Sequence, residues 1–230
     1  VVDPQPHRHL RHVVAMIAAA DLPAAVKARA IEVFRRLAAA EAEVHGSTIE
    51  NVHFDEVGAV DALIDVVGAV LGLSELGVER VYASPPRLGT GSVQSQHGVI
   101  PVPAPATALL LRGAPVEITD IRAELVTPTG AALLATLVEA WTPPPRFTIE
   151  RIGVGAGGRD LAEQANVLRV LIGEAAAGHA ATRRVSVLET ALDDENPQFV
   201  AALLPRLLEA GAHDAMIVPT VMKKGRPGLL

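Results

Sequence analysis

Residues 52–68 read VHFDEVGAVDALIDVVG and join a short acidic, histidine-containing cluster to a helical pattern. Apolar residues recur there at the period of an α-helix, which predicts a helix over residues 58–73. The opposite stripe of this helix carries two carboxylates one turn apart, followed by glycines: Asp61, Asp65, Gly68 and Gly72. Carboxylates at this spacing repel each other by roughly 0.2–0.5 kcal/mol, and a bound cation would offset that cost. Glycines leave room for a ligand or a second backbone to approach.

The cluster and the helix together offer nitrogen and oxygen ligands for a metal ion. One further histidine lies in an extended loop among glycines and prolines. The predicted metal ligands are His53, Asp55, Glu56, Asp61, Asp65 and His97. The alternative is that the first acids favour the positive end of the helix dipole and that the later two form a solvated face.

The composition limits the class of protein. The chain has 230 residues, half of them hydrophobic, which is enough for one large or two ordinary domains with a sizeable core. Aromatic residues make up 3% and the net charge is −6, so we expect no nucleic-acid partner, because such a module needs stacking aromatics and a basic surface. The absence of cysteine excludes thiolate sites and leaves ligands suited to Ni, Mn, Mg or Zn.

Targeting signals are not visible. No apolar run reaches the roughly 18 residues of a membrane span, and no signal peptide opens the chain. We therefore expect a cytoplasmic protein without a membrane partner. The chain opens at Val1 and stops soon after a basic, glycine-rich turn, so we also expect it to be a fragment of a longer protein.

The remaining pattern predicts an α/β (α+β) fold. An N-terminal helical and mixed-sheet domain is predicted over residues 1–172. Its expected helices cover 24–44, 106–111 and 127–141, and its expected strands cover 80–84, 115–119, 147–152 and 166–172. Residues 96–107 and 153–160 are predicted to be loops, the second of them a glycine-rich loop near a ligand.

A small, polar stretch over residues 173–184 is a linker candidate. Beyond it, a strand over 185–188, a helix over 196–210 and a strand over 215–221 predict the start of a ferredoxin-like α+β unit. We assign residues 185–230 to this C-terminal unit.

Acids and bases gather at the strand ends of the C-terminal unit. The predicted nucleotide-binding residues are Asp193, Asp194, Lys223, Lys224 and Arg226. Neighbouring strand ends would bring the acids, which hold a divalent ion, beside the cations, which neutralise phosphates. The alternative is a salt-bridged surface turn.

Seven segments, in this order, resemble the nickel-insertion proteins of the lactate racemase cofactor pathway, the LarC family. They are ENVHFDEVGAVDALIDVVGA, SPPRLGTGSV, HGVIPVPAPAT, ELVTPTGAALL, IGVGAGGRDL, ETALDDENPQ and MKKGRPG. The resemblance runs from about His7 to Gly228.

The resemblance implies an enzyme, a nickel chelatase or cyclometallase of the lyase class. It would insert nickel into pyridinium-3,5-bisthiocarboxylic acid mononucleotide, depend on CTP with Mn²⁺ or Mg²⁺, and supply apo-lactate racemase. Carried over, the C-terminal acids and bases above match the CTP-binding motifs, and His53, Glu56, Asp61 and Asp65 match the N-terminal signature. We also expect a homo-oligomer.

The sequence departs from the family pattern in a few positions. Asp55 stands where a second histidine is expected, which favours a mixed histidine–carboxylate site. Two other functions stay open. The first is a nickel storage or delivery module without turnover, which is suggested by His7, His9 and His12. The second is a structural oligomerisation platform built on the glycine stripe.

Overall fold

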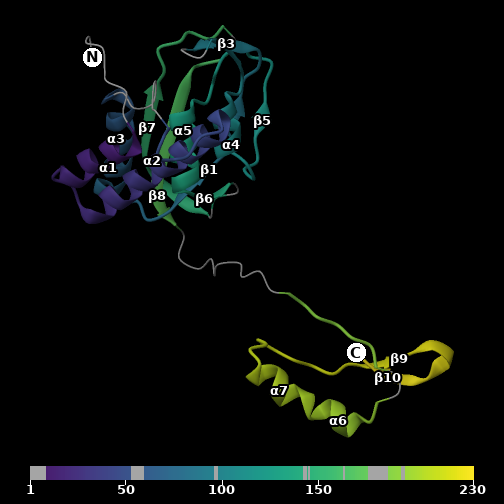
Figure 1. The fold of residues 1–230 in the computed structure, drawn as a ribbon. Coiled ribbons are helices and arrows are strands. Elements are labelled where there is room, and N and C mark those ends of the chain that lie inside the picture. The colour runs from purple at the N-terminus through teal and green to yellow at the C-terminus, as the bar shows by residue number, and fades with distance from the viewer. Residues whose placement is uncertain are drawn as a thin grey trace. The chain divides into compact units, whose positions relative to one another are not determined.

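The computed structural model describes residues 9–52, 60–95, 98–141, 144, 146–162, 164–175, 186–192 and 195–230. The chain divides into two compact units, Val1–Gly178 and His179–Leu230. Each combines helices with two-stranded sheets, which confirms the mixed α/β class (Figure 1). No helix in the described part combines the length and hydropathy that a membrane span requires.

A long central helix organises the first unit. The helices of the first unit are α1 (Leu10–Ala19), α2 (Ala24–His45), α3 (Val60–Glu75), α4 (Pro105–Leu110) and α5 (Pro128–Leu137). Helix α2 contacts each of the other four. Gly46 ends it with φ 59°, a left-handed conformation that glycine adopts without strain.

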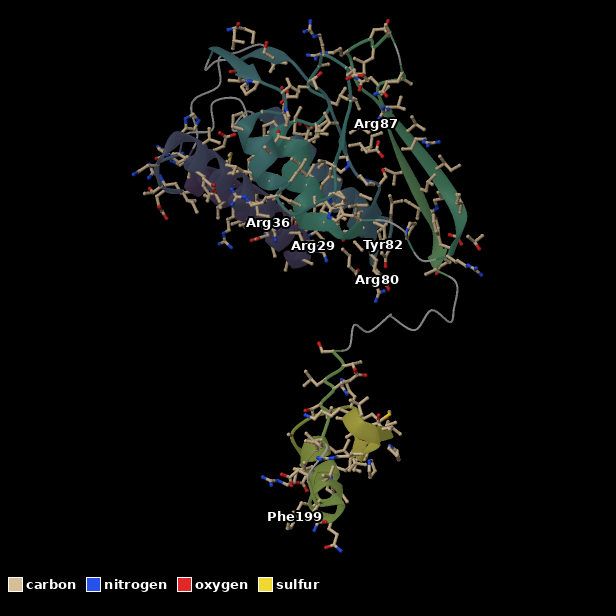
Figure 2. The ribbon with its side chains drawn as sticks, turned by 90° about the vertical axis from the view of Figure 1, so that its right-hand side faces the viewer. Arg29, Arg36, Arg80, Tyr82, Arg87 and Phe199 are labelled. Carbon is tan, nitrogen blue, oxygen red and sulfur yellow. The ribbon has the colours of Figure 1, made fainter. Side chains whose placement is uncertain are left out.

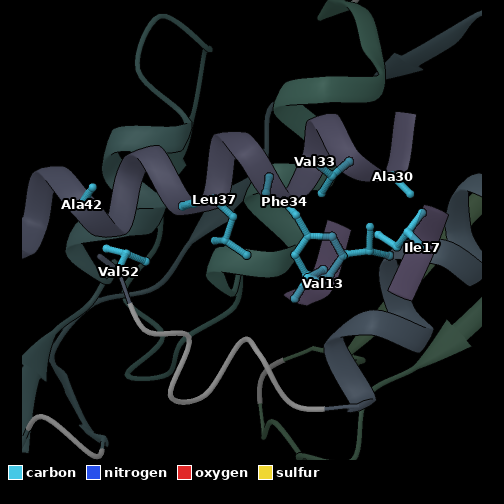
Figure 3. Packing of buried hydrophobic residues seen from close by; sticks show 11 residues of the cluster. Val13, Ile17, Ala30, Val33, Phe34, Leu37, Ala42 and Val52 are labelled. Atoms are coloured by element: carbon cyan, nitrogen blue, oxygen red, sulfur yellow. The ribbon is translucent and has the colours of Figure 1, made fainter. Parts of the chain in front are cut away.

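The core of the first unit follows one face of α2. Buried residues recur there at helical spacing, which is why an alanine-rich helix can bind several neighbours. Phe34 is 0% exposed and packs with Val13 and Ile17 of α1 and with Val66 of α3 (Figure 3). Small alanines around Phe34 allow the helices to approach closely, so aliphatic residues and a single phenylalanine fill the centre.

Four two-stranded sheets complete the first unit. Two of them are parallel: β1 (Val81–Ala83) pairs with β6 (Val138–Trp141), and β2 (Arg87–Leu88) pairs with β5 (Glu117–Ile118). The other two are antiparallel: β3 (Ser92–Ser95) pairs with β4 (Gly98–Pro101), and β7 (Phe147–Ala156) pairs with β8 (Val167–Ala175). The β7–β8 hairpin exposes apolar side chains on both faces; Ile152 is 65% and Leu168 is 70% exposed.

Three predicted boundaries in this unit were wrong. The helix expected to reach Trp141 ends at Leu137, because the next residues form β6 beside β1. Strand β4 occupies part of the loop expected over 96–107. The glycine-rich loop expected from Gly153 starts later, since residues up to Ala156 still pair with β8.

The second unit contains α6 (Pro197–Ala201), α7 (Leu203–Glu209), β9 (Pro219–Val221), the 3₁₀ turn η1 (Lys223–Gly225) and β10 (Pro227–Leu229). Strands β9 and β10 pair antiparallel. The helix expected over 196–210 is broken at Ala202, three residues before Pro205 removes a backbone donor. Residues 186–188 form no strand, although one was expected there. The ferredoxin-like arrangement stays a prediction.

The predicted linker over 173–184 begins inside β8, which ends at Ala175. Its residues 176–184 lie outside the described part of the chain. The assignment of one function to each domain stays a prediction.

Candidate functional site

Two of the predicted metal ligands belong to the described residues, and both are exposed to solvent. Asp61 and Asp65 are exposed on α3, while His53, Asp55, Glu56 and His97 lie outside the described residues. A Cβ added at Gly68 or Gly72 would meet no other atom within 4 Å, so no described helix packs on this stripe. No group of three or more His, Cys, Asp or Glu among the described residues could hold a metal ion. The six-residue metal site therefore stays a prediction.

His9, just before α1, lies beside the described end of the signature segment. The Nδ1 atom of His9 is 3.2 Å from the carbonyl oxygen of Val52, the residue that directly precedes the predicted cluster. The imidazole of His12 lies close by, with ring centroids 5.7 Å apart. Sequence positions more than forty residues apart thus meet at the point where the predicted metal ligands begin.

The backbone of the second unit brings its two predicted nucleotide-binding stretches together. Leu192 and Leu229 exchange both backbone hydrogen bonds, at 2.8 and 2.9 Å. Leu192 directly precedes Asp193 and Asp194, which lie outside the described residues, and Leu229 follows Arg226 by three positions. Of the basic residues, Lys223 and Arg226 are exposed, and the side chain of Lys224 is not described. A shared phosphate site requires this kind of backbone proximity.

A polar hollow in the first unit was not anticipated. It has a volume of about 540 Å³ and lies over the β2–β5 pair and the loop that follows β5. Its charged and amide lining comes from Arg87, Glu117, Asp120 and Gln164. Figure 2 labels the side chain of Arg87. Its Nε lies 3.6 Å from Oε2 of its cross-strand partner Glu117, and it also donates to the side-chain oxygen of Gln164.

A second hollow, of about 270 Å³, adjoins the first. The two share Asp120 and Ile121, and Arg122, Leu161 and Ala162 complete the second lining. Asp120 and Arg122 are both exposed, and neither makes an ion pair or side-chain hydrogen bond within the described part of the chain. Two opposite charges therefore lie two residues apart, without partners among the described residues.

Backbone hydrogen bonds hold the floor of these hollows in place. Strand β5 and the segment after it are bound to the segment around β2 by three backbone hydrogen bonds. They run from Glu117 N to Pro86 O at 3.1 Å, from Thr119 N to Leu88 O at 2.9 Å and from Thr90 N to Ile121 O at 2.9 Å. Gly89 permits this approach, because a Cβ there would stand 2.7 Å from the oxygen of Ile121 and closer still to that of Ala123.

One titration shift is resolved in the described residues, outside these hollows. A side-chain hydrogen bond with Tyr82, and the carboxylate of Glu139, whose Oε2 lies 3.7 Å from Nε, raise the pKa of Arg80. Both contacts therefore favour the charged form of this guanidinium.

Sequence reasoning missed the hollow but had two signals for it. Arg87 belongs to the SPPRLGTGSV segment, and Leu161 ends the IGVGAGGRDL segment, which was predicted to lie near a ligand. These segments meet over the loop 119–122, whose charges carried no motif of their own.

Comparison with known proteins identifies the family. The family model described as nickel insertion protein matches residues 1–230. A protein of Geobacter sp. (strain M21) is 52% identical over 223 residues, which cover 97% of this chain and 58% of the relative.

Two further relatives carry the name pyridinium-3,5-bisthiocarboxylic acid mononucleotide nickel insertion protein. The one from Nocardioides sp. is 48% identical over 99% of this chain and 57% of its own length. The one from Desulfitobacterium hafniense (strain DSM 10664 / DCB-2) is 46% identical over 97% of this chain and 57% of its own length. This chain thus spans less than two thirds of the curated relatives it matches. No solved structure shows a significant match. The match over the full chain, together with these identities, shows that it belongs to the nickel insertion protein family.

Proposed function

We propose that the protein containing this chain inserts nickel into pyridinium-3,5-bisthiocarboxylic acid mononucleotide, with CTP and Mn²⁺ or Mg²⁺, as a nickel chelatase of the lyase class. The observation that carries the proposal is the family match over residues 1–230, joined to the printed names of two relatives. Apo-lactate racemase is the proposed acceptor of the product.

Nickel is cargo in this reaction, so the protein must release it. The two sulfurs and the ring carbon of the mononucleotide supply the final ligands. A weak site of nitrogen and oxygen ligands suits this role better than a closed one. The exposed carboxylates Asp61 and Asp65, and the position of His9 against Val52, support nickel handling at the start of α3.

CTP binding is proposed for the second unit. The exposed Lys223 and Arg226 would make charge-assisted hydrogen bonds to phosphate oxygens, and Asp193 and Asp194 would hold the divalent ion. The backbone pairing of Leu192 with Leu229 supports a common site for these residues.

The test uses the full-length protein with the mononucleotide, Ni²⁺, Mn²⁺ and CTP, and measures activation of apo-lactate racemase. We expect activation only when all components are present. No activation by the complete mixture would refute the proposal. An Asp61→Asn, Asp65→Asn variant should take up and transfer less nickel, whereas Asp21→Asn, an exposed loop carboxylate, serves as its matched control. Wild-type nickel transfer by the double variant would show that α3 contributes no ligands to the nickel site.

A storage or delivery function is the second candidate, because His9 and His12 lie together at the start of α1. It predicts nickel that stays bound in stoichiometric amounts, with no CTP turnover and no product.

A further inference from the structure

We propose that the two neighbouring hollows over β2 and β5 bind the pyridinium mononucleotide, with Arg122 on its phosphate. This inference rests on the proposed function, because it names the place where that substrate sits.

The size of the site suits a ligand of this class. Ligand sites are concave spaces of about 300–1,000 Å³, and the two hollows, of about 540 and 270 Å³, share Asp120 and Ile121 as their common wall. The aliphatic side chains of Ile118, Ile121 and Leu161 line this space beside the charged groups, and they offer apolar surface to a ring.

A guanidinium without a partner among the described residues indicates the chemistry of the ligand. Arg87 already faces Glu117 and Gln164, so its charge is partly compensated. Arg122 and Asp120 have no such partners within the described residues. A ligand that carries a phosphate would supply Arg122 with a partner, and the pyridinium mononucleotide carries one. The two anionic thiocarboxylates on its ring would lie away from Asp120. A phosphate on a guanidinium gains short, charge-assisted hydrogen bonds.

The site is preorganised by its backbone. Thr90 N and Ala123 N both donate to the oxygen of Ile121 at 2.9 Å, which holds the loop that bears Asp120 and Arg122. Gly91 lies beside the Arg122 side chain with φ 90°, a backbone conformation that favours glycine. A loop already ordered before binding loses less entropy when the ligand arrives.

The experiment measures binding of the mononucleotide, and of the nucleoside made by removing its phosphate, to the full-length protein by calorimetry without nickel or CTP. The wild type should bind the mononucleotide at least about tenfold more tightly than the nucleoside, as expected for hydrogen bonds to a charged group. Arg122→Gln should lose this preference, and Arg122→Lys should restore part of it. Asp120→Asn removes a negative charge from the hollow and should not weaken the binding of either ligand.

Arg35→Gln is the matched control, because Arg35 is an exposed arginine on α2. It should bind both ligands as the wild type does. A wild-type phosphate preference in Arg122→Gln overturns the inference. If wild-type protein inserts nickel while Arg122→Gln keeps that preference, the inferred binding site is refuted and the proposed function is retained. If Arg122 governs the preference but the complete mixture makes no product, the proposed function falls and the site stands.

Discussion

Replacing Gly89 by alanine tests whether the floor of the hollow depends on a close backbone approach. The added Cβ would stand 2.7 Å from the oxygen of Ile121, whereas ordinary van der Waals contact begins at 3.4 Å. The segments around β2 and after β5 must therefore separate, which breaks the 2.9 Å bond from Thr90 N to Ile121 O. Overpacking costs about 1–3 kcal/mol and the lost bond about 1 kcal/mol more, so we expect a loss of about 2–4 kcal/mol.

Gly68→Ala provides the matched control, because it makes the same substitution at a position where the added Cβ has no neighbouring atoms. A Cβ at Gly68 on α3 meets nothing within 4 Å. Alanine in an exposed helix interior is about 0.5–1 kcal/mol better than glycine, so this variant should be more stable than the wild type.

Thermal and denaturant unfolding of both variants, followed by circular dichroism, measures the difference. At about 2–4 °C for each kcal/mol, Gly89→Ala should melt roughly 4–16 °C below the wild type, and Gly68→Ala should melt slightly above it. Wild-type stability of Gly89→Ala, or shifts of the same sign in both variants, would refute the reasoning.

Three further changes test other parts of the first unit. Phe34→Ala, at 0% exposure in the centre of the core, should lower the free energy of unfolding by about 3–5 kcal/mol in urea titration; a loss below 1 kcal/mol would contradict the described packing. Thr127→Ala removes the hydroxyl that accepts from Gly130 N at 3.2 Å and should cost about 1 kcal/mol, while Thr127→Ser should keep the cap. Arg112→Ala breaks a 2.9 Å pair with Glu43 whose side chains are both more than half exposed, so it should cost less than about 1 kcal/mol and nothing measurable in 1 M salt.

The local features of the fold were predictable from sequence. The helix predicted over residues 24–44 is found over Ala24–His45, and the helix predicted from residue 127 begins at Pro128. These features depend on residues close together in the chain. The ends of α5 and β7 depend instead on partners far away, since Val138 pairs with Val81 of β1 and Gly153 with Val170 of β8.

The residues that line the hollow likewise differ in whether the sequence singles them out. Arg87 and the segment ending at Leu161 lie in motifs that sequence alone singles out. Asp120 and Arg122 carry no motif, and their importance comes from a loop that only the β2–β5 pairing brings beside Arg87 and Gln164. A hollow made by three separate stretches has no periodicity that a sequence could display.

The β7–β8 hairpin has a consequence for hydrogen exchange. It is bonded across its length but leaves side chains such as Ile152 and Leu168 in water on both faces, so little apolar burial opposes its opening. Its amides should exchange with deuterium sooner than those of α2. The connection between its strands also supplies Leu161, Ala162 and Gln164 to the hollows. A ligand bound there would oppose opening by mass action, and the slowing of exchange along β7 and β8 would report its occupancy.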